Sequence, residues 1–268
     1  MFVEQKECSV GNTKTGALAK ALQVIELLSR NPKGLALVDM SKTLGFPKST
    51  IHHMLQPLLL NDYISQDDDT KKYSLGLRFL EISSRILADF DIRERARRYL
   101  IQLHEKCHEV VHLYLLRNGK IVCIDKMGAA AGGLSISSYV GWSTEPHASA
   151  AGKVLLSQLT NEEIGEIYPD GLLKPYGKNT ITNLNQLFKE LALVRKRGYA
   201  IDDEEYYEGV RCIGVPVRSR GHIVASISVT GSIFSMTMKR IEAGLIDLVR
   251  ETGESISREL SNVPVGSV

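Results

Sequence analysis

The stretch LVDMSKTLGFPKSTIHHMLQPLLLNDYI, residues 37–64, has the layout of two short helices joined by a tight turn. The first helix fits Val38–Leu44 and ends at Gly45, because glycine readily adopts the left-handed conformation found at helix ends. The second begins at Pro47 or Lys48, since proline is tolerated at the first helical position. Its apolar stripe consists of Ile51, Met54 or Leu55, and Leu58. This pattern predicts a helix-turn-helix, in which the second helix presents its N-terminal side chains to the DNA major groove.

The charge pattern of this stretch supports a surface for nucleic acid. No acidic residue occurs from Met40 to Asn61, although the whole chain has a formal net charge of only +2. Affinity for DNA must therefore come from local placement of charge, because gross charge does not supply it. The residues expected to reach bases or phosphates are Lys48, Ser49, Thr50, His52, His53 and Gln56. The alternative is an ordinary helical subdomain that makes protein contacts.

A hairpin is expected directly after the second helix. Tyr63–Gln66 and Lys72–Leu75 are predicted as short strands around the polar turn 67–71, the arrangement of a wing. Lys71 and Lys72 are candidate phosphate contacts, while the acidic residues 67–69 must face away from DNA; the alternative is a solvated turn. Pro57 lies inside the second helix, so the helix either kinks there or ends early.

The composition is typical of a soluble two-domain protein. The chain has 268 residues, of which 43% are hydrophobic, enough to form ordinary cores. The four cysteines show no paired metal spacing, which favours reduced thiols in the cytoplasm. The first residues lack the apolar core of a signal peptide, and no apolar run approaches the ~20 residues needed to span a bilayer. We expect a cytoplasmic protein without membrane contact.

The rest of the chain alternates helices and strands. A helix from Ala17 stops at the breakers of residues 31–34. Further helices are expected at 75–90, 91–107, 148–158, 183–196 and 237–259, with hairpins at 110–116/120–126 and 213–217/223–230. This order predicts an α+β fold, with a sheet that carries helices on its faces.

The second half also contains a candidate ligand site. Residues His147–Lys153 (HASAAGK) form a run of small residues at an expected helix start, where free backbone N–H groups suit a carboxylate. Ser228 and Thr230 share one face of a strand and offer two hydroxyls. Together with Asp202 and Cys212, these groups suit a short hydroxy-acid or keto-acid.

Several separated blocks resemble the IclR family of bacterial transcription regulators, from about Lys14 to about Leu260. They include ALQVIELLSRNPKGLALVDMSKTLGFPKSTIHHML, KKYSLGLRFLEI, EVVHLYLLRNGKIVCIDKM, PHASAAGKVLLS, RKRGYAIDDEEYYEGVRCIGVPV and IVASISVTG. The resemblance implies a two-domain protein with an N-terminal winged helix-turn-helix, a linker helix and a C-terminal GAF-like α/β effector-binding domain. The corresponding bounds are a flexible arm 1–13, a DNA-binding domain 14–76, a linker 77–91, an effector-binding and oligomerisation domain 92–262 and a tail 263–268.

The resemblance also implies partners and site residues. Family members act as homodimers or homotetramers on palindromic double-stranded operators, more often as repressors, and respond to small organic acids or related metabolites. Relatives that bind keto-acids use backbone N–H groups at the positions of Ala150 and Ala151. They add side chains at the positions of Asp202, Cys212, Ser228 and Thr230. The region 127–138 departs from the family pattern, which leaves the identity of the effector open.

Two other functions compete with a transcription regulator. Cys212 with His147 or another histidine as base suggests a small-acid-processing enzyme, and His147, Asp202 and Cys212 together suggest a metal sensor. Each residue also has a structural alternative, since a free cysteine is often a buried small hydrophobe and His147 would fix a loop by hydrogen bonding. The sequence favours the regulator, with no catalytic activity, no metal and no cofactor.

Overall fold

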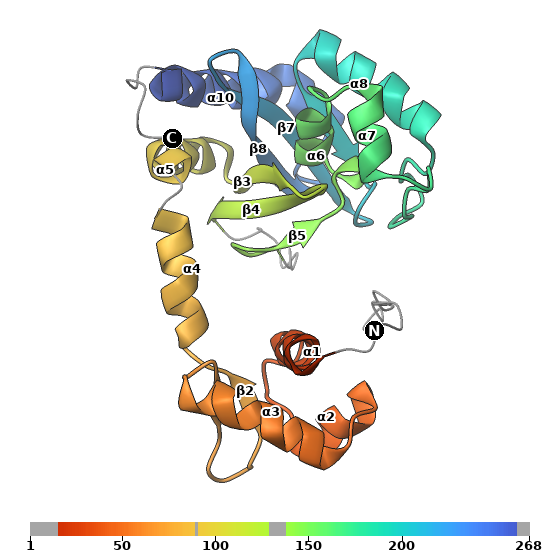
Figure 1. Ribbon diagram of the computed structural model, residues 1–268. Coiled ribbons are helices and arrows are strands. Elements are labelled where there is room, and N and C mark those ends of the chain that lie inside the picture. Colours follow the sequence, from red (N-terminus) through yellow and green to blue (C-terminus); the bar gives the residue numbers. More distant parts are fainter. Residues whose placement is uncertain (1–15, 89–90, 129–137, 262–268) are drawn as a thin grey trace. The chain divides into compact units, whose positions relative to one another are not determined.

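The computed structural model describes residues 16–88, 91–128 and 138–261 and divides into two compact units (Figure 1). The first unit extends to Ile86 and the second begins at Leu87. The predicted arm 1–13 and tail 263–268 lie outside the described residues, as does most of region 127–138. Within the described residues, no helix is both long and apolar enough to cross a membrane.

The first unit contains three helices and a small hairpin, followed by most of helix α4 (Arg78–Ala88). Helices α1 (Ala17–Ser29), α2 (Leu37–Leu44) and α3 (Lys48–Leu60) precede strands β1 (Ile64–Gln66) and β2 (Tyr73–Leu75). Gly45 ends α2 at φ 70°, as its sequence position predicted. The strands pair antiparallel, so the predicted hairpin is present. The buried side chains that join these elements are Val24, Leu28, Met40, Ile51, Met54, Leu55, Ile64 and Tyr73.

Helix α3 passes through Pro57 without ending there. The helix continues to Leu60, so the alternative of an early end is wrong. Leu58 and Leu59 pack against the core of the first unit, which keeps the last turn in place although proline donates no hydrogen bond. The Asn61 side-chain amide donates to the Pro57 carbonyl at 2.8 Å and closes the helix end.

The helix expected at 75–90 begins later than predicted. Helix α4 spans Arg78–Ala88, because Leu75 ends strand β2 and Gly76 lies tightly against the chain at Asp62. The Gly76 N–H donates to the Tyr63 carbonyl at 2.8 Å, so this residue still belongs to the hairpin.

The second unit is built on a six-stranded antiparallel sheet of order β5-β4-β3-β8-β7-β6. Helices α5 and α10 cover one face, and α6 covers the other with α8 packed beside it (Figure 1). The strand bounds are β3 Val110–Arg117, β4 Lys120–Met127, β5 Ser143–Thr144, β6 Ala200–Asp203, β7 Val210–Ser219 and β8 His222–Ser232. The helix bounds are α5 Asp91–Cys107, α6 Ala150–Leu156, α7 Asn161–Ile167, α8 Leu184–Arg197 and α10 Ile246–Ser261.

One predicted helix of this unit is shorter than expected, another is broken, and several short elements were not predicted. The helix expected at 148–158 starts at Ala150, because Ser149 is extended and its side chain accepts from the Gly152 N–H at 3.0 Å. The helix expected at 237–259 is broken at Gly244, whose φ of 128° no α-helix contains. Strands β5 and β6 and helix α7 are too short to show a clear periodicity.

Glycine allows α6 to lie directly on strand β7. A Cβ atom on Gly214 of β7 would stand 2.7 Å from the Ala150 carbonyl carbon. A Cβ on Gly152 would meet the Pro146 carbonyl oxygen at 2.1 Å. The start of α6 therefore approaches the sheet more closely than any side chain would permit.

Replacing Gly152 with alanine should destabilise the second unit. The added methyl group meets backbone rather than a flexible side chain, and overpacking of this kind costs about 1–3 kcal/mol of the free energy of unfolding. Gly165→Ala in α7 is the matched control, because a Cβ there meets nothing within 4 Å. Chemical unfolding of both variants checks the prediction, and an equal effect of the two substitutions would contradict it.

Candidate nucleic-acid interface and ligand pocket

The outer face of α3 is polar and exposed, while its inner face holds the first unit together. Ile51, Met54 and Leu55 are buried. Five of the six residues predicted to reach DNA are exposed, and Thr50 is half-buried; the exposed ones are Lys48, Ser49, His52, His53 and Gln56. The Gln56 amide lies 3.4 Å from His52 Nε2, one helical turn away. The structure thus gathers the predicted polar groups on one accessible face.

The wing is a closed polar turn. Lys71 and Lys72 are both exposed, as a contact with phosphate requires. The Asp67 carboxylate accepts hydrogen bonds from the Thr70 N–H at 2.7 Å and the Thr70 hydroxyl at 2.6 Å. These bonds hold the pKa of Asp67 below its ordinary value. Asp67 is therefore used to close the turn.

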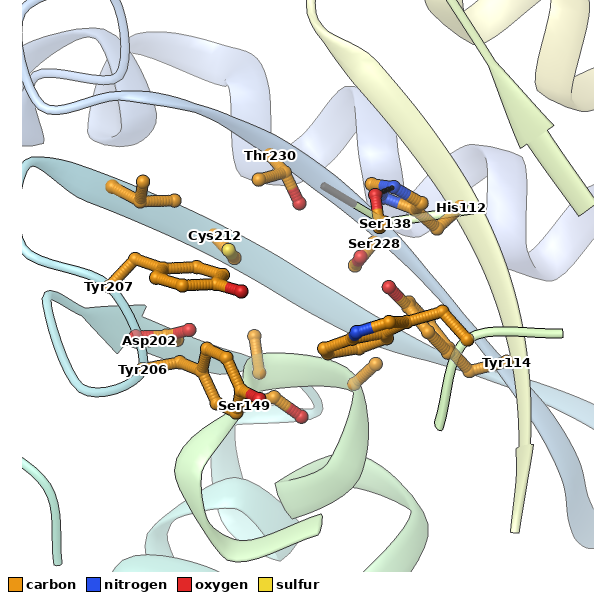
Figure 2. A pocket seen from close by; sticks show the side chains of 14 residues that line it. His112, Tyr114, Ser138, Ser149, Asp202, Tyr206, Tyr207, Cys212, Ser228 and Thr230 are labelled. Atoms are coloured by element: carbon orange, nitrogen blue, oxygen red, sulfur yellow. Dashed lines mark hydrogen bonds between the residues drawn. The ribbon is translucent and has the colours of Figure 1, made fainter. Parts of the chain in front are cut away.

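The six residues predicted for the effector converge on one pocket of the second unit. Ala150 and Ala151 come from the start of α6, and Asp202, Cys212, Ser228 and Thr230 come from three neighbouring strands (Figure 2). The pocket encloses a cavity of about 50 Å³. Among the described residues that line it, none is lysine or arginine.

The register of the sheet explains why these side chains meet. Asp202 pairs with Cys212, and Cys212 pairs with Thr230, so the three form one row across β6, β7 and β8. In the adjacent row, Gly214 pairs with Ser228, and Ser228 pairs with His112 of β3. Residues in these rows point to the same face of the sheet, because side chains alternate along each strand.

The floor of polar groups faces the first turn of α6. Ala150 and Ala151 follow the N-cap Ser149, and N–H groups at such positions have no acceptor within their helix. Because Gly214 lets this turn approach the sheet, the N–H groups lie beside the hydroxyls of the strand rows. This geometry suits an anion that accepts several hydrogen bonds.

Most of the other residues that line the pocket were not predicted from the sequence. Figure 2 shows Tyr114 on one side and Tyr206 and Tyr207 on the other, with Cys212, Ser228 and Thr230 on the strands between them. The other lining residues not predicted are His112, Ser138, Trp142, Ser149 and Val210. The alternation rule that paired Ser228 with Thr230 also places His112 and Tyr114 on one face of β3, so this signal was available.

Asp202 and Cys212 are unusual acids because of where they lie. Asp202 is 3% exposed, and burial, with the nearby Glu205 carboxylate, raises its pKa to about 7. Burial and the Asp202 carboxylate hold the pKa of Cys212 well above its ordinary value. A nucleophilic cysteine needs a lowered pKa, so the thiol is in the opposite condition.

His147 does not join this pocket. Its buried ring lies 3.2 Å from the Tyr168 hydroxyl through Nδ1 and 2.9 Å from the Lys174 carbonyl through Nε2. These bonds confirm that His147 fixes a loop. The enzyme alternative therefore loses His147 as a base, and the metal alternative loses one ligand. Within the described ranges, no cluster of three or more His, Cys, Asp or Glu residues is arranged to hold a metal ion.

His112 is a buried, neutral part of the wall. Its Nε2 lies 2.7 Å from the Ser138 hydroxyl, while Nδ1 has no hydrogen-bond partner among the described residues. Burial, with the Lys126 charge nearby, lowers the pKa of His112 to about 3. The ring therefore stays uncharged across the physiological range.

Both halves of the chain match known protein families. Residues 17–68 match the IclR helix-turn-helix domain, and residues 84–258 match the family described as bacterial transcriptional regulator IclR, C-terminal. The DNA-binding transcriptional repressor YiaJ of Escherichia coli is 30% identical over 263 residues, which is 97% of this chain and 92% of YiaJ.

Solved structures show the same fold. The crystal structure of Thermotoga maritima IclR is 31% identical, with a TM-score of 0.75 over 91% of this chain and 98% of that one. An IclR homologue from Microbacterium hydrocarbonoxydans, complexed with 4-hydroxybenzoate, is 22% identical with a TM-score of 0.78, over 91% and 99% of the two chains. These matches confirm the predicted two-domain fold class.

The neutral state of His112 makes stability depend on pH. His112 has a lower pKa in the folded state than in the unfolded state. The contribution of the neutral His112 ring to the free energy of unfolding is therefore complete above its ordinary pKa of 6.5 and is lost as the pH falls toward 3. The loss amounts to about 1.4 kcal/mol per pH unit. We expect His112→Phe, which keeps a ring but removes the titrating nitrogens, to flatten this part of the profile. Urea unfolding between pH 7.5 and 4.5 measures it; parallel profiles for both proteins would contradict the assignment.

Proposed function

Because the chain belongs to the IclR family, and is thus a DNA-binding transcription regulator, we propose that it is a repressor released or retained by a small organic acid. The observation that carries the proposal is the convergence of backbone N–H groups, hydroxyls and one buried carboxyl on a single small pocket. A short hydroxy-acid or keto-acid has the size and the acceptor groups that this lining can bind. The name of YiaJ supports repression, and the 4-hydroxybenzoate complex shows that a homologue of the same fold takes an acid.

We propose the following division of labour along the chain. Residues 14–76 bind a palindromic operator, with contacts from the outer face of α3 and from the wing. Residues 77–91 form the linker, and residues 92–262 bind the effector and pair the subunits into a homodimer or homotetramer. Effector binding favours one arrangement of the oligomer and thereby changes the spacing of the two recognition helices.

Enzymatic use of the pocket is the second candidate function, and the geometry disfavours it. Cys212 has a raised pKa, and both ring nitrogens of His147 are engaged outside the pocket.

A gel-shift assay with DNA from upstream of the protein's own gene, with and without a panel of short acids, tests the proposed regulator directly. Failure to shift any such fragment at low salt would contradict it.

Removing the Lys48 charge should weaken DNA binding without regard to sequence. A lysine that contacts phosphate contributes about one released counterion, so Lys48→Ala should lower the slope of log affinity against log salt by about 1. Fluorescence anisotropy at several salt concentrations measures this slope. Lys178→Ala removes the same charge from an exposed position of the second unit and is the control. Equal slopes for the two variants would count against the assignment of α3.

Removing one hydroxyl from the pocket should weaken binding of the effector and leave binding of the operator unchanged. Thr230→Val keeps the shape of the side chain, and losing a hydrogen bond to a charged group costs about 1.5–3 kcal/mol, or roughly 10- to 100-fold in affinity. The matched control is Thr252→Val on α10, whose hydroxyl donates to the Leu248 carbonyl at 2.8 Å. Acid-induced change in the gel shift and thermal stabilisation by the same acid check the result. A response unchanged in Thr230→Val would remove this residue from the site.

A further inference from the structure

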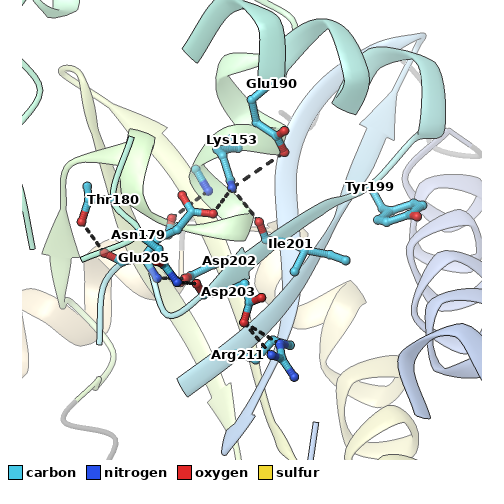
Figure 3. Close-up of polar contacts among 12 residues, drawn as sticks. Lys153, Asn179, Thr180, Glu190, Tyr199, Ile201, Asp202, Asp203, Glu205 and Arg211 are labelled. Carbon is cyan, nitrogen blue, oxygen red and sulfur yellow. Dashed lines mark hydrogen bonds and ion pairs between the residues drawn. The ribbon is translucent and has the colours of Figure 1, made fainter. Parts of the chain in front are cut away.

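A lysine is completely buried behind the pocket. Lys153 of α6 is 1% exposed, and its ammonium donates to the Ile201 carbonyl at 2.6 Å and to the Glu205 carboxylate (Figure 3). Glu190 lies farther away, at 3.8 Å, and its carboxylate is already paired with Arg197 at 2.6 Å. A buried ammonium is costly unless it is paired, so the contact with Glu205 is what keeps Lys153 in the core.

Glu205 in turn holds the part of the chain that carries two pocket tyrosines. Its backbone N–H donates to the Asp202 carboxyl at 2.8 Å, and its carbonyl accepts from the Thr180 hydroxyl at 2.6 Å. The next residues, Tyr206 and Tyr207, line the pocket. Lys153 therefore connects the helix that offers free N–H groups with the turn that carries Tyr206 and Tyr207.

The buried charges around this lysine do not cancel if both carboxyls are ionised. Lys153 faces Glu205 directly, and Asp202 lies next to Glu205. The second oxygen of Glu205, Oε2, has no hydrogen-bond partner among the described residues, so Lys153 is the group that balances this carboxylate. Burial raises the pKa of Glu205, but the contact with Lys153 opposes the shift. Lys153 therefore neutralises Glu205, and no other cation of the described ranges is paired with Asp202.

Among the described residues around Asp202, Lys153 is the one cation. The groups that face it are Glu205 from its own turn, Lys153 from α6, Cys212 from β7, and Tyr114 and Tyr206 from the pocket wall. Lys126 belongs to the neighbouring row beside His112, and its ammonium donates to the Ser138 carbonyl at 2.6 Å. Two adjacent buried carboxyls with one lysine retain one proton between them, and the carboxyl without the lysine contact keeps it.

We infer that the Lys153–Glu205 ion pair reserves the Asp202 carboxyl as a hydrogen-bond donor, so that the pocket binds a carboxylate effector together with one proton. The inference rests on the proposed function of the pocket as an acid site. The protonated Asp202 donates to an oxygen of the ligand, whereas an ionised Asp202 would place two negative charges side by side. Lys153 and Glu205 are positioning residues, because they act on the ligand through Asp202.

The first test needs no ligand. Aspartate labelled with 13C at the side-chain carboxyl is titrated by NMR, and the Asp202 signal is identified by its loss in Asp202→Asn. We expect this signal to titrate near pH 7 in the wild-type chain. In Glu205→Gln its midpoint should fall by at least one pH unit, because Lys153 then has no nearer carboxylate. Glu190→Gln is the matched control and should leave the midpoint unchanged, since Arg197 holds that carboxylate.

The second test uses pyruvate as the probe. Its affinity for the wild-type protein should be constant below pH 7 and fall about tenfold per pH unit above it, while Asp202→Asn should show a flat profile. A wild-type Asp202 signal that titrates near pH 4, or one unmoved by Glu205→Gln, would overturn the inference even if pyruvate binds. Normal titration of Asp202 near pH 7 without binding of any short acid would instead overturn the proposed function and leave the placement of the proton established.

Discussion

The close contact between the start of α6 and strand β7 is the constraint on which the second unit depends. At Gly214 of β7 no side chain separates the strand from the helix, since a Cβ atom there would meet the Ala150 backbone. Without this contact, the first N–H groups of α6 would stand a side-chain layer away from the polar rows of the sheet. The same approach fixes where Lys153, one turn later, enters the core, and therefore where a carboxylate must lie to meet it.

The depth of Lys153 then decides the character of the pocket. A buried ammonium requires a carboxylate, and Glu205 supplies it from the turn between β6 and β7. That turn also carries Tyr206 and Tyr207. The contact that neutralises Lys153 therefore also holds these two residues in the wall of the pocket. Lys153 and Glu205 neutralise each other, and no lysine or arginine is among the described residues that line the pocket. The pocket is therefore polar without being positively charged. Recognition must then depend on hydrogen bonds and on the proton at Asp202.

Local patterns predicted the elements whose signals lie within a few neighbouring residues. The glycine at the end of α2, the apolar stripe of α3 and the alternation of Ser228 and Thr230 are such signals, and the structure contains each feature. The strand register could not be predicted from the sequence, because it depends on the geometry of the turns and on the register shift between Val217 and Arg218. The residue types made Asp202 and Cys212 candidates for the pocket, but the rows that bring them together with Ser228 and Thr230 depend on that register. Lys153 was noted only as the end of a motif, since its ion-pair partner lies far along the chain.

The proposed DNA-binding face and the proposed effector pocket also differ in how their charges act. The polar side chains proposed to contact DNA from α3 and from the wing are mostly exposed, so on this proposal each adds a small, salt-screened increment to DNA affinity. A nearly neutral chain can bind a polyanion through a local excess of such groups. In the pocket the charges are buried, where one unpaired carboxyl costs more than an exposed lysine gains. On the proposed function, substitutions on α3 therefore adjust operator affinity gradually. A change at Lys153, Glu205 or Asp202 alters the charge balance of the core itself, so ligand preference and the stability of the second unit must change together.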